Sequence, residues 1–145
     1  MPCSCYLIVM KNVKANVKTS VIQQISKLVE QDDNVAVLWL YGSRAKGTEQ
    51  ADSDYDFAVA FNQFPEDAWQ RRLQPELLCQ SWQDILSNSK ISVVDINLIP
   101  LPLAFSVVQQ GKVIFCRDSM RLIKEEGRIS SMWDIDYNWH QEHYG

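Results

Sequence analysis

The spacing of apolar residues changes along the chain and predicts helices and strands in alternation. From residue 16 to residue 30 the apolar side chains recur every three or four positions, which is typical of one face of a helix. Val35 to Tyr41 is instead a continuous apolar run, whose short length and composition indicate a buried strand. A further apolar run ends at Phe61 and predicts a second strand, which begins near Asp54.

The remainder of the chain continues this alternation and predicts an α/β (α+β) fold. A proline and acidic residues indicate a helix from Phe64 toward Leu86, and Pro75 leaves open one kinked helix or two shorter ones. Trp69 and Trp82 are expected in the core. The later expected elements are a strand from Ile91 to Ile99, a helix from Leu103 to Gln110, a strand from Lys112 to Cys116 and a helix from Ser119 to about Arg128. We therefore expect one domain over residues 16–128, a small mixed sheet flanked by helices.

The two ends of the chain are expected to lie outside this domain. Residues 1–15 are predicted to be an N-terminal tail, and a start of translation at Met10 is an alternative. Residues 129–145 combine aromatic and acidic side chains, which is typical of a protein–protein interface, so this C-terminal tail is a candidate docking element. A helix packed on the same domain is the alternative. His140 and His143 have the spacing of metal ligands, but without further ligands they do not indicate a metal site.

Composition narrows the classes of function. The formal net charge of −4 argues against non-specific binding to nucleic acid, because such binding depends on neutralising phosphates. The apolar run from Tyr6 to Met10 is far too short to span a membrane. The 4 cysteines, without other signs of secretion, indicate reduced thiols. We expect a cytoplasmic protein that contacts neither nucleic acid nor a membrane directly.

Two carboxylates open the second predicted strand. Asp54 and Asp56 are two positions apart, so on a strand both side chains point to one face, roughly 6–7 Å apart at the backbone. Two carboxylates this close repel each other unless a cation neutralises them. Mg²⁺ binds carboxylate oxygens and completes its shell with water and substrate phosphate. Asp54 and Asp56 are therefore candidate metal ligands and catalytic residues, and a solvated turn before an edge strand is the alternative.

The turn after the first strand is a candidate nucleotide-binding site. Gly42 lets the backbone approach a ligand closely, and Ser43 supplies a hydroxyl and an N–H for phosphate oxygens. Arg44 can offset the charge of a triphosphate, and a short helix beginning there favours an anion. An ordinary loop is the alternative for Gly42-Ser43.

A third carboxylate, Asp95, lies in the predicted strand from Ile91 to Ile99. If that strand pairs with the strand of Asp54 and Asp56, Asp95 can complete the metal site and accept the proton of the acceptor. The alternative is that Asp95 caps a turn or pairs with an arginine.

These residues together resemble the signature G-S-x₁₀-D-x-D of the DNA polymerase β-like nucleotidyltransferases. The stretches from Gly42 to Thr48 and from Ser53 to Phe57 are most similar to minimal nucleotidyltransferase (MNT) domains, the antitoxins of HEPN-domain ribonuclease toxins. The close match covers about twenty residues, and the order of elements extends it over most of the chain. The resemblance implies a single minimal polymerase β-like domain.

The resemblance also implies a reaction and a partner. Ser43 would contact the triphosphate of ATP, Asp54 and Asp56 would bind two Mg²⁺ ions, and Asp95 would be the third carboxylate. Such an antitoxin transfers AMP from ATP to a hydroxyl, in this family a tyrosine of the cognate HEPN toxin, with which it would form a hetero-oligomer. Two alternatives stay open: an antitoxin that acts by contact alone, and a nucleotidyltransferase that acts on a small molecule.

Overall fold

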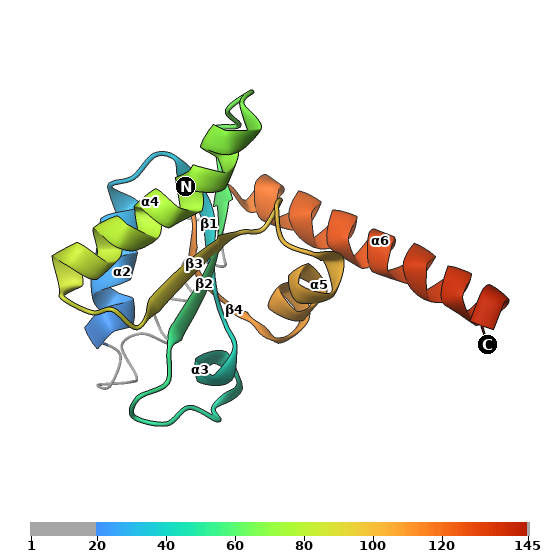
Figure 1. The fold of residues 1–145 in the computed structure, drawn as a ribbon, viewed down its shortest axis with the longest axis horizontal. Helices are drawn as coiled ribbons and strands as arrows, with labels where there is room; N and C mark the ends of the chain where they lie inside the picture. Colours follow the sequence, from blue (N-terminus) through green and yellow to red (C-terminus); the bar gives the residue numbers. More distant parts are fainter. Residues whose placement is uncertain (1–19, 145) are drawn as a thin grey trace.

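The structure, a computed structural model, describes residues 20–144, and its elements alternate as the apolar pattern predicts (Figure 1). In chain order they are α2 (Ser20–Glu30), β1 (Val35–Tyr41), α3 (Ser43–Lys46), β2 (Tyr55–Phe61), α4 (Ala68–Leu86), β3 (Ile91–Asp95), α5 (Leu101–Gln110), β4 (Lys112–Cys116) and α6 (Ser119–Tyr144). The N-terminal tail predicted for residues 1–15, with the alternative start at Met10, lies outside the described residues.

The four strands form one mixed sheet in the order β3-β2-β1-β4. β1 pairs antiparallel with both β2 and β4, whereas β2 pairs parallel with β3. The parallel pair requires a crossover, and α4 provides it between β2 and β3. The prediction of a small mixed sheet flanked by helices is confirmed.

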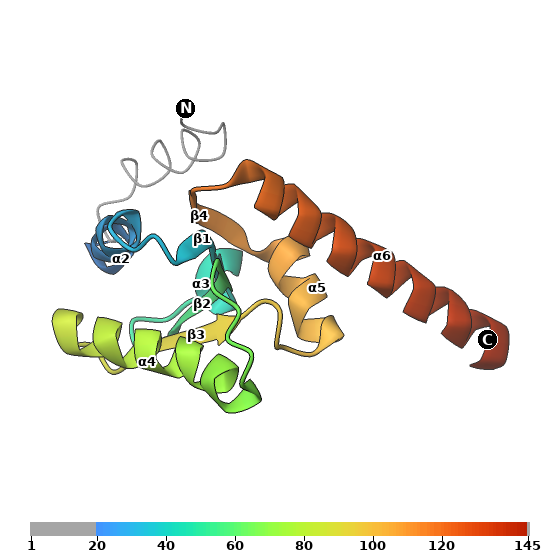
Figure 2. The ribbon, with the colours of Figure 1, turned by 90° about the horizontal axis from the view of Figure 1, so that it is seen from above.

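Helices cover both faces of this sheet, α2 and α4 on one face and α5 and α6 on the other (Figure 2). Alternate residues of β1 divide between the two layers, because successive side chains of a strand point in opposite directions. Leu38 packs with Ile25 of α2, whereas Trp39 packs with Val107 of α5 and Ile129 of α6. The sheet is therefore buried on both sides, which explains why β1 is apolar throughout.

The helix α4 passes through Pro75 without ending, so one helix forms rather than two. It begins after Asp67, whose side chain accepts a hydrogen bond of 2.9 Å from the N–H of Trp69. Trp82 is buried, as predicted, and its ring meets Phe57 edge to face. Trp69, in contrast, is 65% exposed, and its prediction as a core residue is wrong, because it lies in the first turn of α4.

The helix α6 is longer than predicted, since it continues through Gly127 to Tyr144 instead of ending near Arg128. A glycine inside a helix costs about 1 kcal/mol relative to alanine, and contacts on both sides of Gly127 offset this cost. Before it, Glu125 is held by hydrogen bonds, and after it the ring of Trp133 stacks on Phe105 with centroids 4.4 Å apart. Although α6 is long, neither it nor another helix within residues 20–144 is apolar enough to cross a membrane.

Candidate active site

The turn at the end of β1 lies directly against a carboxylate of β2. Gly42 has φ 76° and ψ −155°, and its carbonyl oxygen accepts hydrogen bonds of 3.2 Å from the N–H groups of Ala45 and Lys46. A Cβ added to Gly42 would overlap Oδ2 of Asp56 and lie 3.3 Å from its Cγ. The structure therefore brings the predicted turn, Gly42 and the adjoining Ser43, together with one of the predicted carboxylates.

The two predicted metal ligands, Asp54 and Asp56, lie where β2 begins. Asp56 is the second residue of β2 and is half-buried, whereas Asp54 precedes the strand and is exposed. Burial raises the pKa of Asp56, and the negative charge of Asp54 raises this pKa further. Burial, together with the charge of Asp56, also raises the pKa of the Tyr41 hydroxyl to about 12.

This arrangement fits a divalent cation. The raised pKa of Asp56 arises because its negative charge is desolvated and faces a second carboxylate, and a cation between the two removes both penalties. Asp54 and Asp56 supply oxygen ligands, and Mg²⁺ takes its remaining ligands from water and from substrate phosphates. The donor set is thus suited to a metal ion that arrives with a nucleotide.

Asp95 does not join this site, and its prediction as the third carboxylate needs correction. It is paired with Val59, three residues further along β2 than Asp56, so the register places it at the other end of the strand and toward the opposite face of the sheet. Its carboxylate accepts a hydrogen bond of 2.8 Å from the N–H of Asn97. Burial raises the pKa of Asp95, although the bond from Asn97 and the charge of Arg121 lower it. Asp95 caps the turn after β3, as the alternative interpretation held.

Ser92 occupies the position on β3 where a third ligand was expected. It is in register with Asp56 across the parallel pair, so the two side chains share one face of the sheet. Among residues 20–144, no group of three or more histidine, cysteine, aspartate or glutamate side chains is arranged to hold a metal ion. The end of the sheet where β2 and β3 begin therefore offers two carboxylates and a hydroxyl.

Arg44 organises the loop that leads to Asp54. Its Nε and one terminal nitrogen donate hydrogen bonds of 3.1 and 2.9 Å to the carbonyl oxygen of Ser53, and its guanidinium lies 3.8 Å from the ring centroid of Tyr55. These contacts tie α3 to the residues on both sides of Asp54. Contact between Arg44 and a nucleotide stays a prediction, and the observed bonds assign Arg44 a positioning role.

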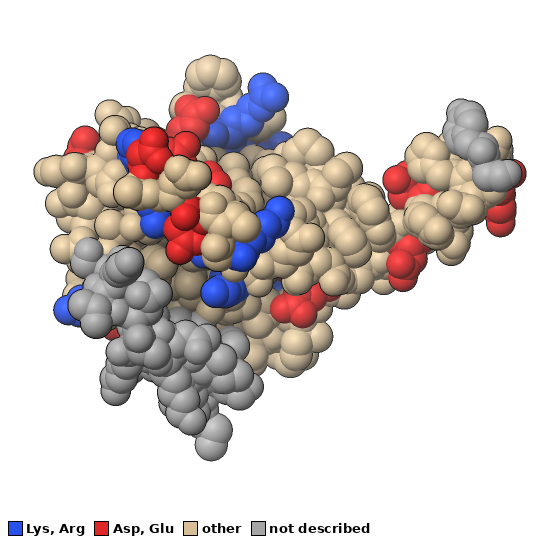
Figure 3. Space-filling view, turned by 90° about the horizontal axis from the view of Figure 1, so that it is seen from below, with Lys and Arg blue, Asp and Glu red and all other residues tan. Residues whose placement is uncertain are grey.

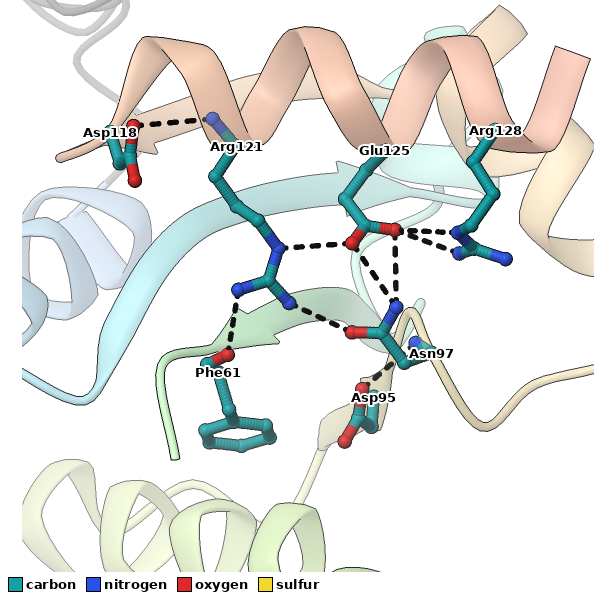
Figure 4. Close-up of polar contacts among 7 residues, drawn as sticks. All are labelled: Phe61, Asp95, Asn97, Asp118, Arg121, Glu125 and Arg128. Carbon is teal, nitrogen blue, oxygen red and sulfur yellow. Dashed lines mark hydrogen bonds and ion pairs between the residues drawn. The ribbon is translucent and has the colours of Figure 1, made fainter. Parts of the chain in front are cut away.

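A buried polar network, not found from the sequence, joins α6 to the far ends of β2 and β3 (Figure 4). Glu125 is 4% exposed and accepts hydrogen bonds from Arg121, Arg128 and Asn97. Arg121 also donates to the carbonyl oxygen of Phe61, the last residue of β2, at 2.9 Å. The helical spacing of Arg121, Glu125 and Arg128 is a sequence signal for part of this network, but the contacts to Asn97 and Phe61 depend on the tertiary fold.

The comparison with protein families identifies the family of this chain. The family model described as "Polymerase beta, Nucleotidyltransferase" matches residues 23–120, which include the turn at Gly42 and both carboxylates. The chain belongs to the polymerase beta nucleotidyltransferase family. A comparison with curated proteins found no match.

Solved structures with this fold include antitoxins of toxin–antitoxin pairs. A toxin–antitoxin structure with AMP-PNP is similar with a TM-score of 0.66 and 22% identity, over 85% of this chain and 94% of that one. The MNT antitoxin in complex with a tri-AMPylated HEPN toxin, from Shewanella oneidensis, has a TM-score of 0.63 and 20% identity, over 87% and 94%. A MntA–HepT toxin–antitoxin structure has a TM-score of 0.61 and 21% identity, over 84% and 92%. At these identities the likeness establishes a shared fold for this polymerase beta family member.

Proposed function

We propose that this nucleotidyltransferase is an antitoxin that transfers AMP from ATP to a hydroxyl of a cognate HEPN ribonuclease toxin, and that it acts in the cytoplasm. The observation that carries the proposal is the contact between the Gly42 turn and the Asp56 carboxylate in a chain of the polymerase beta family. The fold shared with a MNT antitoxin, whose HEPN toxin is tri-AMPylated, supports a protein acceptor. A tyrosine hydroxyl is the acceptor that the resemblance implies.

Each of the residues around the turn has its own role in this reaction. Gly42 lets the backbone approach the triphosphate, and the Ser43 hydroxyl donates to a phosphate oxygen. Asp54 and Asp56 hold Mg²⁺, which when bound supplies positive charge to the phosphates and to the leaving group. The acceptor oxygen attacks the α-phosphorus, the bond to pyrophosphate breaks, and the hydroxyl proton passes to solvent. The protein contributes position and charge, which are the main requirements of phosphoryl transfer.

A second candidate function is an antitoxin that blocks its toxin by contact alone. The observation that favours it is Ser92, because a hydroxyl stands beside Asp56 where a third carboxylate was expected. Under this hypothesis the chain binds ATP and the toxin but leaves the mass of the toxin unchanged.

The intact mass of the HEPN toxin separates these functions. After incubation with this chain, ATP and Mg²⁺, the toxin is expected to gain one or more AMP units. Asp56→Asn is expected to lower the rate of gain by a factor of about 10² or more, since it removes one metal-binding charge beside the phosphates. Asp54→Asn is expected to act in the same direction.

Asp95→Asn provides the matched control for these variants. It is the same chemical change, but Asp95 lies at the other end of the strand pair and caps a turn through an oxygen that asparagine retains. Transfer at the wild-type rate by Asp95→Asn, together with loss in Asp56→Asn, is the expected result. Unchanged transfer by Asp56→Asn would sink the assignment of the site, and tight binding without any mass gain would favour the contact-only antitoxin.

A further inference from the structure

The last turns of α6 project from the domain and end away from the sheet (Figures 1 and 2). The stack of Trp133 on Phe105 is the contact with α5 that precedes this projection. Beyond it every residue from 134 to 143, here called the distal segment, is exposed. A helix this short is marginal on its own in water, so the distal segment depends on the anchored part of α6 for its form.

The distal segment continues an apolar stripe along one side of α6. Met132, Ile135 and Trp139 follow one another at spacings of three and four, which places them on one face of the helix. Ile135 is 70% exposed and Trp139 is 46% exposed. The ring of His143 stacks on the ring of Trp139 with centroids 4.2 Å apart and extends this face toward the end of the helix. Large apolar side chains at this spacing are the anchors by which a helix enters a hydrophobic groove.

Acidic side chains flank this stripe within the distal segment, which contains no lysine or arginine. Asp134, Asp136 and Glu142 are the charged residues after Arg128, and the sequence has no lysine or arginine beyond that position. Figure 3 shows acidic but no Lys or Arg side chains on the projecting end, in contrast to the mixed charges of the domain. A second copy of this chain would bring like charges together, whereas a groove with lysine or arginine on its rim would match the segment.

We propose that the distal segment of α6 is a docking arm whose apolar stripe enters a hydrophobic groove with a basic rim on the HEPN partner. This inference rests on the proposed function for the identity of the partner. The arm is tethered by Glu125 and Arg121 at the end of β2 opposite Asp56, so docking and nucleotidyl transfer are carried by different parts of the domain. Aromatic anchors of this kind contribute much of the affinity of an interface.

The test measures binding of the HEPN toxin to the full chain in the absence of ATP, so that no transfer occurs. The double substitution Ile135→Ala with Trp139→Ala is expected to raise Kd about 30-fold or more. The matched control is Met120→Ala with Ile123→Ala, which removes two apolar side chains that are also exposed, 71% and 63%, from the anchored part of the same helix. This control is expected to change Kd by less than about threefold. Circular dichroism checks that both variants keep the helix content of the wild type.

Different results distinguish this inference from the proposed function. Loss of binding in the arm variant supports the arm whether or not the toxin gains AMP. Equal Kd values for the arm variant, the control and the wild type would overturn the arm, even if transfer proceeds. Self-association of the wild type that the arm variant abolishes, with toxin binding intact, would also overturn it. An association rate that does not fall as salt rises would contradict the basic rim.

Discussion

Replacing Gly42 with alanine tests the contact on which the proposed site depends. The backbone at Gly42, with φ 76° and ψ −155°, lies in a region that only glycine occupies readily. The added methyl group would also overlap Oδ2 of Asp56. Either the turn opens or the carboxylate moves, and both changes separate the residues proposed to hold the nucleotide and the metal.

The expected loss of stability in Gly42→Ala is the sum of the cost of the strained backbone and the cost of moving the Asp56 side chain. A strained backbone of this kind costs about 1–3 kcal/mol, and moving the Asp56 side chain from its rotamer adds about 0.5–1.5 kcal/mol. Together they lower the free energy of unfolding by roughly 2–4 kcal/mol, which for a chain of this size lowers Tm by about 5–15 °C. Misplacing a reacting group by about 1 Å can reduce a rate about 10²-fold, so transfer is expected to fall by at least that factor.

Gly47→Ala is the matched control for Gly42→Ala. Gly47 also has φ 76°, but a Cβ there would meet no atom within 4 Å. The Gly47→Ala variant is expected to have a free energy of unfolding about 1–2 kcal/mol lower, because alanine is disfavoured in the left-handed conformation. Its rate of transfer is expected to stay unchanged. Thermal unfolding and single-turnover transfer to the HEPN toxin, measured for both variants below the lower Tm, make the comparison. If Gly42→Ala transferred AMP as fast as Gly47→Ala, the contact with Asp56 would not be part of the active site.

Two further predictions concern the network and the register. Burial raises the pKa of Glu125, but hydrogen bonds from Arg128, Asn97 and Arg121 outweigh it, and the net pKa lies below its ordinary value of 4.5. Glu125→Gln is therefore expected to lower the free energy of unfolding by about 3–5 kcal/mol at neutral pH. This difference shrinks as pH falls through the pKa of Glu125 in the folded protein, because the wild-type carboxylate then becomes protonated. Urea unfolding measures the difference, and a loss equal to that of the exposed Glu126→Gln would contradict the prediction. Ser92→Asp adds a third carboxylate beside Asp56 and is expected to lower the Mg²⁺ concentration for half-maximal transfer about tenfold, whereas an unchanged Mg²⁺ dependence would show that Ser92 does not face the metal.

Local patterns were sufficient to predict β1, β4 and the turn at Gly42. β1 and β4 have the predicted bounds, because a continuous apolar run between polar residues leaves little choice of ends. The Gly42 turn and Asp56 come together because β1 and β2 pair antiparallel, a direction that the connection of about a dozen residues did not fix in the sequence. The helix α6 was predicted too short, because propensity at Gly127 is a local signal and the contacts that override it come from Phe105 and Asn97, far away in the sequence.

The position of Asp95 could not be predicted from spacing, because it depends on the register of two strands separated by α4. A shift of one residue in the register turns every side chain of a strand to the opposite face of the sheet. No turn type fixes the register of a parallel pair, because its strands are joined by a long crossover. The sequence favoured a strand that continued to Ile99, with Asp95 in its middle. β3 instead ends at Asp95, and its pairing begins with Ile91 beside Tyr55, which leaves Ser92 beside Asp56.

The carboxylate site and the attachment of α6 lie at opposite ends of β2. Asp56 lies near the start of β2, and Phe61, which accepts the hydrogen bond from Arg121, is its last residue. Five strand positions between them correspond to roughly 17 Å. In Figure 1, accordingly, α3 lies at one end of the sheet and α6 begins at the other. A substitution that loosens α6 would therefore weaken the hold on a docked partner before it disturbs the carboxylates. Toxin affinity and Mg²⁺ dependence should thus respond to different residues of this domain.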